Sequence, residues 1–208
     1  FLTILVLFSE NAYSQDKNWT HFRGSNLNGI SSAEKIPLIW ADPNIKWETE
    51  IHDRGHSSPV VFENQIWVTT ATTDGKELYA VCLDYETGKI IYDIKVFEVE
   101  DVIGKHGINT YASPTPCIEK GFVYVHFGSL GTACLRTSDG SIVWKRNDLK
   151  CNHVQGPGSS PVLYKNLLIL HYEGTDVRYI VALDKATGKQ GWRTDRPAEP
   201  YVPLPQIG

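Results

Sequence analysis

Short apolar runs recur along the chain, and polar turn residues precede each of them. Residues 65–70, 122–127 and 167–172 are rich in Val, Ile, Leu and aromatic side chains. The runs are too short for helices, and Asn or Gly residues lie just before them, so the pattern predicts β-strands. No window of the sequence shows a convincing helical period. The chain is therefore predicted to be all-β.

Two sequence elements recur together three times. The first is ungapped and reads CLDYETGKIIY, CLRTSDGSIVW and ALDKATGKQGW, with its glycine at Gly88, Gly140 and Gly188. The second lies upstream and reads SPVVFENQIWVT, TPCIEKGFVYVH and SPVLYKNLLILH. A polar turn divides the second element into two apolar runs, and the glycine of the first element supplies the positive φ of a hairpin turn. Each repeat is therefore predicted to hold four antiparallel strands.

Units of about 45–50 residues with four antiparallel strands are typical of propeller blades. A β-sandwich also has short strands and turns, but it does not predict an ungapped motif that recurs. The expected fold class is an incomplete β-propeller of about three four-stranded blades plus an orphan outer strand. Cys82, Cys134 and Ala182 share one repeat position, where a small buried side chain suits the third strand. For these two thiols we expect packing and not redox chemistry.

The ungapped element resembles the tryptophan-docking motif of quinoprotein dehydrogenases and their pyrroloquinoline-quinone (PQQ)-like relatives, roughly A-x-D-x-x-T-G-K-x-x-W. The third copy matches in full, from Ala182 to Trp192, whereas the first ends in Tyr92 and the second has Arg136 in place of Asp. The resemblance covers about residues 40–196, and WTHFRGSNLNGISS resembles the opening segment of PQQ-like proteins. It implies that the aromatic ring packs between adjacent blades while the Asp and the turn amides tie the blade edge. The residues expected in this structural role are Trp47, Tyr92, Trp144, Trp192, Asp84, Asp184, Gly88, Gly140 and Gly188.

The repeats divide the chain into predicted parts. These are a partial signal peptide (1–14), a lead-in segment (15–43), an orphan outer strand (44–51), three blades (52–99, 100–147 and 148–196) and a truncated linker to a missing blade (197–208). Propellers have about four to eight blades, so three repeats are expected to be a fragment of a larger ring. The resemblance implies about seven or eight blades in the complete protein.

The N-terminal residues predict export. Residues 1–8 are apolar but too short to span a bilayer as a helix, and Ala12 and Ser14 have the spacing of a signal-peptidase site. A buried N-terminal strand is the alternative. We expect a periplasmic or otherwise extracytoplasmic protein without a transmembrane segment in its mature chain. The net charge of −4 and the pI near 6.0 provide no basic surface for nucleic acid.

Catalytic and metal motifs match poorly. The cysteines are scattered without a C-x-x-C pair, which excludes the common zinc and thioredoxin spacings. The chain has no G-x-S-x-G, phosphate-binding loop or H-E-x-x-H. His52 and His56 are four residues apart, but a loop does not hold both imidazoles on one face as a helix does. We expect no catalytic residue and no metal ligand in this segment.

Polar residues gather in the loops that lead into each blade. In a propeller these loops share one face with the connections between second and third strands, and ligands often bind there. His126 and His171 end two second strands at matching positions and are expected to face the same side. The alternative is that loop residues cap turns and contact water. The candidate ligand-binding residues are Arg54, His56, His106, Asn109, Tyr111, Asn152 and His153.

Two functions remain open. The first is an exported PQQ-like propeller that binds a protein, glycan or small molecule through its loop face without catalysis; the resemblance includes an outer-membrane-protein assembly propeller with such a role. The alternative is a fragment of a PQQ-dependent oxidoreductase whose catalytic residues lie in missing sequence. The resemblance implies adjacent cysteines and a calcium-binding carboxylate and amide set for such enzymes. No Cys-Cys pair occurs here, so PQQ with calcium is expected only under the alternative.

Overall fold

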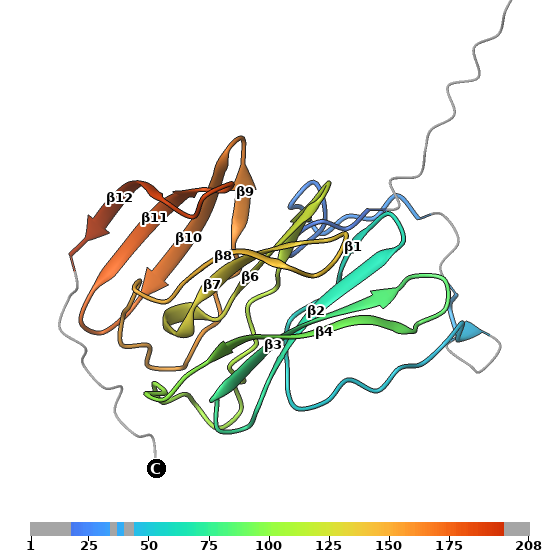
Figure 1. The fold of residues 1–208 in the computed structure, drawn as a ribbon, viewed down its shortest axis with the longest axis horizontal. Coiled ribbons are helices and arrows are strands. Elements are labelled where there is room, and N and C mark those ends of the chain that lie inside the picture. Colours follow the sequence, from blue (N-terminus) through green and yellow to red (C-terminus); the bar gives the residue numbers. More distant parts are fainter. Residues whose placement is uncertain (1–17, 34–36, 40–43, 198–208) are drawn as a thin grey trace, which may run out of the picture.

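The computed structural model of the protein describes residues 18–33, 37–39 and 44–197. These residues form three four-stranded antiparallel sheets, and each sheet contains one sequence repeat. Figure 1 shows the sheets side by side in chain order. The predicted fold class of about three four-stranded blades is confirmed. The predicted signal peptide (1–14) and residues 198–208 of the predicted linker lie outside the described residues.

Within each blade the strands pair in chain order, from the innermost to the outermost. The first blade holds β1 (Val60–Phe62), β2 (Gln65–Ala71), β3 (Glu77–Asp84) and β4 (Ile90–Glu98). The second holds β5 (Cys117–Glu119), β6 (Phe122–His126), β7 (Thr132–Arg136) and β8 (Ile142–Arg146), with the 3-10 turn η2 (Gly128–Leu130) after β6. The third holds β9 (Val162–Tyr164), β10 (Leu167–Glu173), β11 (Arg178–Asp184) and β12 (Gln190–Arg196).

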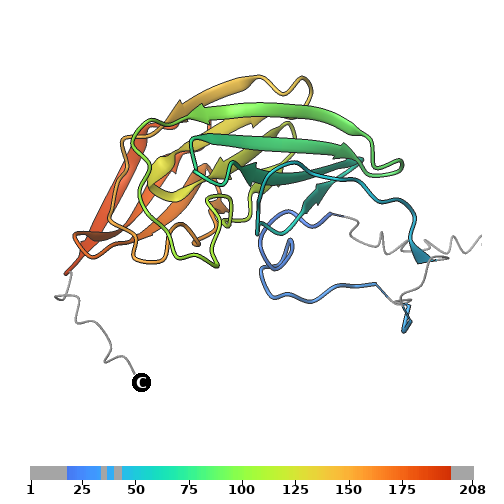
Figure 2. The same cartoon turned by 90° about the horizontal axis from the view of Figure 1, so that it is seen from below.

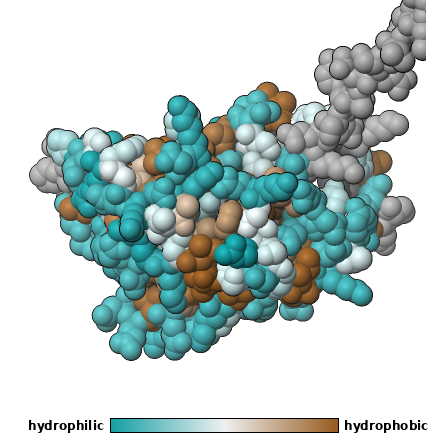
Figure 3. Space-filling view, turned by 45° about the horizontal axis from the view of Figure 1, so that its top comes forward, coloured by the Kyte–Doolittle hydropathy of each residue, from teal (hydrophilic) through white to brown (hydrophobic). Residues whose placement is uncertain are grey.

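The hydrophobic core lies between the blades. One cluster of buried side chains joins the first and second blades, with Trp67 and Leu78 on one side and Val123 and Leu135 on the other. A second cluster joins the second and third blades. Because side chains alternate across a strand, the second blade, which lies between the other two, buries both faces of its sheet. The surface in Figure 3 is mostly hydrophilic, with separate apolar patches.

A small residue on the third strand makes room for two large neighbours. Cys82 pairs with Trp67 on one side and with Tyr92 on the other, and the two rings lie 6.0 Å apart. A shift in register directly after Cys82 is repeated after Cys134 and Ala182. The expectation of a small buried side chain at this position is confirmed, because all three are at most 1% exposed. Burial raises the pKa of the Cys82 thiol to about 12.

An aromatic side chain on the outermost strand contacts the hairpin turn of the next blade. The Trp144 indole N–H donates to the Lys185 carbonyl at 2.9 Å, and the Arg146 guanidinium donates to the Gly188 carbonyl at 2.7 Å. Gly188 has a φ of +70°, and a Cβ atom there would lie 2.7 Å from the indole ring. The ring therefore fits only against a residue without a side chain.

The same contact occurs at the other boundary between described blades. Tyr92 takes the place of the tryptophan, and its hydroxyl donates to the Ser138 carbonyl at 2.6 Å. Ile94, two residues later, packs on Gly140, where a Cβ would lie 2.8 Å from the isoleucine methyl group. Trp192 in the third blade is 42% exposed and lies on β12, which is exposed along its whole length.

Each hairpin turn is held by a carboxylate. Asp84 accepts the backbone N–H and the hydroxyl of Thr87, both at 2.8 Å, and Asp184 holds Thr187 in the same way. In the second blade, where Arg136 stands in place of the Asp, Asp139 accepts from the N–H and hydroxyl of Ser141 instead. These hydrogen bonds lower the pKa of all three carboxyl groups. The turn therefore keeps an anionic cap even where the motif departs from its pattern.

Residues 44–51 differ from the prediction of an orphan outer strand, because the structure assigns no strand to them. In the part of the chain that the structure describes, no strand pairs with this segment through a ladder of backbone hydrogen bonds. Side-chain contacts hold the segment instead. The Trp47 indole donates to the Tyr85 carbonyl at 3.0 Å, and the Thr49 hydroxyl donates to the Gly88 carbonyl at 2.6 Å.

Hydroxyl groups link the blades near their innermost strands. The backbone N–H of Ser58 donates to the Thr115 hydroxyl at 2.9 Å, and the N–H of Thr115 donates to the Ser160 hydroxyl at 3.0 Å. These residues begin the recurring Ser-Pro or Thr-Pro element, so one repeat position forms a ladder from blade to blade. The following proline cannot donate to a neighbour, which places this linking role on the residue before it.

The lead-in segment runs on one side of the sheets, as Figure 2 shows in blue. Trp19 forms an isolated antiparallel bridge with Val61 of β1, through two backbone hydrogen bonds of 2.8 Å. The next residue, Thr20, accepts the N–H of Ile118 in β5 at 3.0 Å. Residues far apart in sequence are therefore joined at the inner edges of the blades.

The fit between Trp144 and Gly188 predicts unequal effects of two glycine substitutions. Gly121→Ala has a positive φ but no atom within 4 Å of the new Cβ, so it should cost roughly 1–2 kcal/mol from backbone strain alone. Gly188→Ala has similar strain and also displaces the indole, so it should cost about 1–3 kcal/mol more. Urea unfolding of the two variants measures the difference. Equal losses of stability in the two variants would contradict the fit between Trp144 and Gly188. So would an extra loss in Gly188→Ala that persists when Trp144 is also replaced by Ala.

The hydroxyl ladder predicts that Thr115→Val destabilises the protein by about 1–2 kcal/mol, because the Ser58 N–H loses its acceptor while side-chain shape is kept. Thr73→Val is the matched control, since Thr73 is exposed in a turn. It should change the free energy of unfolding by less than about 0.5 kcal/mol. Thermal and urea unfolding test both variants, and similar stabilities for the two would exclude the ladder as an important contact.

Candidate functional site

The loop face begins with the turn between β2 and β3. Asp74 organises this turn by accepting the Thr72 hydroxyl at 2.6 Å and the Lys76 backbone N–H at 3.1 Å. These hydrogen bonds lower the pKa of Asp74. The Val99 N–H donates to the Lys76 carbonyl at 2.8 Å, so the turn also holds the chain as it leaves β4. The result is a fixed rim on the outer side of the first blade.

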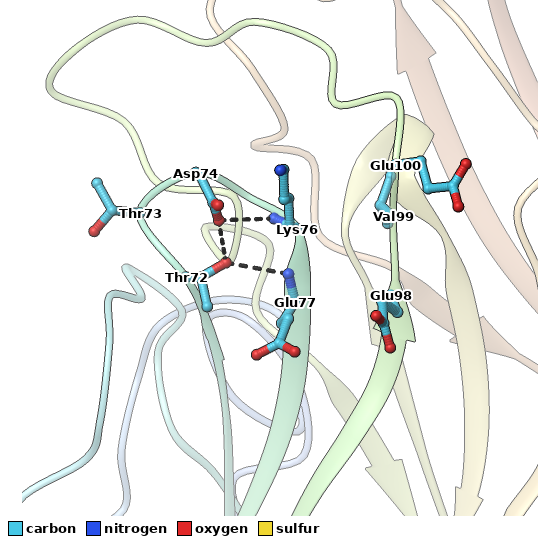
Figure 4. Close-up of a pocket in the computed structure, with 8 residues that line it drawn as sticks. All are labelled: Thr72, Thr73, Asp74, Lys76, Glu77, Glu98, Val99 and Glu100. Atoms are coloured by element: carbon cyan, nitrogen blue, oxygen red, sulfur yellow. Dashed lines mark hydrogen bonds between the residues drawn. The ribbon is translucent and has the colours of Figure 1, made fainter.

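A groove of about 710 Å³ lies between this turn and the end of β4 (Figure 4). Its walls are mainly charged and hydroxylated. The residues that line it are Thr72, Thr73, Asp74, Lys76, Glu77, Glu98, Val99 and Glu100. Four of these carry carboxylates and one carries an ammonium group, so the groove is acidic.

Two of the carboxylates are already bound by one lysine. Lys95 lies 2.9 Å from Glu77 and 3.0 Å from Glu98, and the Tyr79 hydroxyl also donates to Glu77 at 2.6 Å. The hydrogen bonds from Tyr79 and Lys95 lower the pKa of Glu77, and the bond to Glu77 raises the pKa of Tyr79 to about 12. The acidic character that remains toward the solvent comes mainly from Asp74 and Glu100.

A second, smaller cavity lies where the first and second blades meet, and it shares Thr72 and Thr73 with the groove. Three of the predicted residues, Arg54, Asn109 and Tyr111, line it together with Lys105. Its volume of about 10 Å³ is large enough for a single water molecule. These side chains are therefore close together, but a ligand larger than water does not fit inside the cavity and could contact them only at the surface of the protein.

Tyr111 and Lys105 form a packed pair beside this cavity. Tyr111 is only 8% exposed, and a Cβ on Gly75 would lie 2.6 Å from its ring. The Lys105 ammonium lies 5.2 Å from the ring centroid, a cation–π distance. Burial raises the pKa of the Tyr111 hydroxyl. Tyr111 thus supports the turn at Gly75.

Asn109 uses its amide group to fasten two loops together. Its amide nitrogen donates to the carbonyls of Gln155 and Pro157 at 2.7 and 3.0 Å, and its oxygen accepts from Thr110 and Ser113. An asparagine side chain has two donors and one acceptor oxygen with two lone pairs, so this amide has no free position for a ligand. Asn109 therefore positions the loops.

Three other candidates line neither the groove nor the small cavity. His56 and Asn152 are exposed, and their backbone N–H groups donate to Ala112 and Asp176. His106 is also exposed, and its ring accepts the N–H of Ile108 at 3.3 Å. The structure brings Arg54, Asn109 and Tyr111 together around the small cavity. His106 lies beside them, because its backbone carbonyl accepts the Asn109 N–H at 3.0 Å.

His153 belongs to the interface between the second and third blades. Its ring stacks on Tyr172 with centroids 6.4 Å apart, and the Cys151 sulfur lies 3.5 Å from both ring nitrogens. Burial lowers the pKa of His153 and raises the pKa of Cys151 to about 11. Neutral imidazole and neutral thiol are the stable forms here. This arrangement favours packing over nucleophilic chemistry, which needs a thiolate.

His126 and His171 occupy the same repeat position in different surroundings. His126 is 2% exposed, its Nδ1 lies 2.8 Å from the Thr132 hydroxyl, and its ring meets the edge of Tyr172. His171 is exposed and lies 3.2 Å from Glu173. Both histidines were expected to face the same side; His171 reaches solvent there, whereas the third blade covers His126.

Comparison with models of known protein families shows the family of this chain. The model of the family described as outer membrane protein assembly factor BamB, a PQQ-like repeat family, matches residues 38–202. The chain belongs to this PQQ-like family. Among curated proteins, none matches the sequence of the chain. Among the described residues, no helix is long and apolar enough to cross a membrane.

Solved structures share the fold of this PQQ-like chain. A quinohemoprotein alcohol dehydrogenase from Comamonas testosteroni matches with a TM-score of 0.51 and 20% identity over 71% of this chain and 22% of its own. The quinohemoprotein alcohol dehydrogenase ADHIIG from Pseudomonas putida HK5 has a TM-score of 0.50 and 18% identity over 72% of this chain and 22% of its own. BamB from Moraxella catarrhalis has a TM-score of 0.47 and 17% identity over 72% of this chain and 42% of its own. The PQQ-like chain thus spans less than half the length of each protein.

Among the described residues, the side chains that could bind a metal ion are scattered and not clustered. Calcium requires several oxygen ligands gathered at one point. Asn109, the amide nearest the loop cavity, is fully used, and the described part of the chain contains no group of three His, Cys, Asp or Glu side chains placed to hold a metal ion. The four cysteines are buried and separate, with Cys117 and Cys134 between blades two and three.

The acidic groove was missed from sequence because its charges belong to a hairpin turn and a strand end. Asp74 and Glu77 are 21 residues or more from Glu98 in the chain, and each alone resembles an ordinary solvated residue. The sequence does predict that the connection between the second and third strands lies on the loop face, and the groove lies beside this connection. This prediction indicates where a groove could form but does not indicate its charge.

Burial of His126 predicts a pH-dependent stability. Burial, with a smaller contribution from His153, lowers its pKa to about 3, below the value near 6.5 of an unfolded chain. The stabilisation is complete above pH 6.5 and is lost as the pH falls toward 3, at about 1.4 kcal/mol per pH unit. Urea unfolding between pH 7 and 4 should show a shallower loss for His126→Asn. The exposed-site control His56→Asn should follow the wild type; identical slopes in all three proteins would contradict the assignment.

Proposed function

We propose that this chain is part of an exported PQQ-like propeller that binds a partner through its loop face and does not catalyse a reaction. The observation that carries the proposal is the acidic groove of about 710 Å³ between the β2–β3 turn and the end of β4. It is a concave surface formed beside loops on a rigid scaffold, and binding residues are often found in such loops. The apolar residues 1–8 and the Ala12–Ser14 spacing support export.

The chemistry of the remaining side chains supports a binding role. Burial raises the pKa of the thiols Cys82, Cys117, Cys134 and Cys151, so none is a ready nucleophile. His126 and His153 are packed around Tyr172. The four thiols and these two imidazoles are therefore used for blade packing, while the exposed groove holds carboxylates.

A protein is the favoured ligand among protein, glycan and small molecule. The description of the family names an assembly factor, and such a factor acts on other proteins. The exposed carboxylates Asp74 and Glu100 suit a basic segment of a partner, because opposite charges steer and orient encounter. An oxidoreductase built on PQQ is the competing function, and its cofactor would have to be held by other parts of the complete protein.

Site-specific crosslinking tests the loop face. A photoreactive residue at Thr73 in full-length protein should give a discrete protein adduct in exporting cells. The same residue at Lys120, exposed in the β5–β6 turn on the opposite face, should give none. Glu100→Arg should reduce the Thr73 adduct at least fivefold. No adduct at Thr73, or equal adducts at both positions, would exclude protein binding at this face.

Cofactor reconstitution separates the two functions. Full-length protein mixed with PQQ and calcium, then passed through gel filtration, should retain no quinone absorbance and should not reduce a dye with alcohols or sugars as substrates. Retained absorbance together with dye reduction would establish the oxidoreductase and overturn the non-catalytic proposal.

A further inference from the structure

The innermost strand of each blade has one edge without a strand neighbour. Val61, Ile118 and Leu163 occupy the same repeat position on β1, β5 and β9, three residues after the Ser or Thr that precedes proline. An unpaired backbone N–H at such an edge is unfavourable when water is excluded. All three N–H groups find an acceptor in the same short piece of chain.

Successive residues of the lead-in segment provide these acceptors. The Trp19 carbonyl accepts from Val61 at 2.8 Å, and the Thr20 carbonyl accepts from Ile118 at 3.0 Å. The third contact is different, because the N–H of Leu163 donates at 3.4 Å to Nε2 of the His21 imidazole. Two of the contacts are made by backbone carbonyls, which do not titrate, and the third by a side chain that does.

The contact with Leu163 requires a neutral imidazole. Nε2 of His21 must carry a lone pair to accept the N–H, so the ring proton is on Nδ1, 2.8 Å from the Thr20 hydroxyl. Protonation would put a second N–H on the ring, facing the Leu163 N–H, and two donors repel. The third contact would then be lost, while those of Val61 and Ile118 would remain.

A carboxylate is available to the protonated ring. Glu119 of β5 is the charged group that acts on His21, and its oxygens already accept from Lys185 at 2.6 Å and from the Tyr124 hydroxyl at 2.9 Å. The other strand at the contact, β9, has the sequence VLY and carries no carboxylate or cation. Burial lowers the pKa of His21, and Glu119 opposes this shift.

We infer that His21 is a proton-dependent latch: as a neutral ring it fastens the lead-in segment to the third blade, and as a cation it leaves Leu163 for Glu119. Because the pKa of His21 is lowered, the latch is closed at neutral pH and opens as the pH falls below the ordinary histidine value near 6.5. Opening frees the edge of β9 and leaves the segment attached through Trp19 and Thr20.

Amide exchange by NMR measures the latch directly. In the full-length protein, the protection of the Leu163 amide, corrected for intrinsic exchange, should fall at least tenfold between pH 7.5 and 5.0. The Ile118 amide, held by a backbone carbonyl, is the internal control and should change less than twofold. This comparison removes any general loss of stability at low pH, including that caused by His126.

Variants of two residues make the test specific. In His21→Gln, the amide oxygen can accept the Leu163 N–H at any pH, so its protection should no longer depend on pH. His21→Ala should leave Leu163 unprotected at both pH values, and Glu119→Gln should move the transition to lower pH. Parallel changes at Leu163 and Ile118, or a pH-dependent Leu163 amide in His21→Gln, would overturn the latch.

Discussion

Contact between an aromatic ring and a glycine in the next blade is the constraint on which the rest of the structure depends. Trp144 packs on Gly188, and Tyr92 packs beside Gly140. Each aromatic side chain also donates a hydrogen bond to a backbone carbonyl in the turn that contains its glycine. The register shift at the end of the third strand directs the ring toward its neighbour. Since the cores lie between blades, this contact sets the spacing at which all other apolar side chains can pack.

The second constraint is the free edge of each innermost strand. The innermost strand of each blade is three residues long, and its blade offers no hydrogen-bond acceptor to the backbone N–H groups that point away from the second strand. The chain solves this with two devices at one repeat element. Ser58, Thr115 and Ser160 link neighbouring blades through hydroxyl groups, and the lead-in segment supplies acceptors three residues later. The inner side of the propeller is thus joined by polar contacts, and the outer side by aromatic ones.

The fold was predictable from sequence because its information is local and repeated. The glycine turn, the small residue at Cys82 and the aromatic residue at Tyr92 lie within eleven residues of each other, and each copy confirms the others. The site was less predictable, because its geometry depends on which loops meet. Asn109 resembled a ligand-binding amide, but Gln155 and Pro157, 46 and 48 residues away, use both of its donors. The contact between His21 and Leu163 spans 142 residues and has no local signature.

One repeat position shows why the chemistry of a propeller belongs to pairs of blades. Thr69, His126 and His171 share that position on the second strand. Thr69 is buried and its hydroxyl has no hydrogen-bond partner among the described residues, while His126 is buried against Thr132 and Tyr172 and kept neutral. His171 lies on the third blade, meets solvent and pairs with Glu173. The repeat decides the direction in which the side chain points, but the neighbouring blade decides whether that side chain is buried. A substitution at such a position therefore changes an interface, and its effect cannot be transferred from one blade to another.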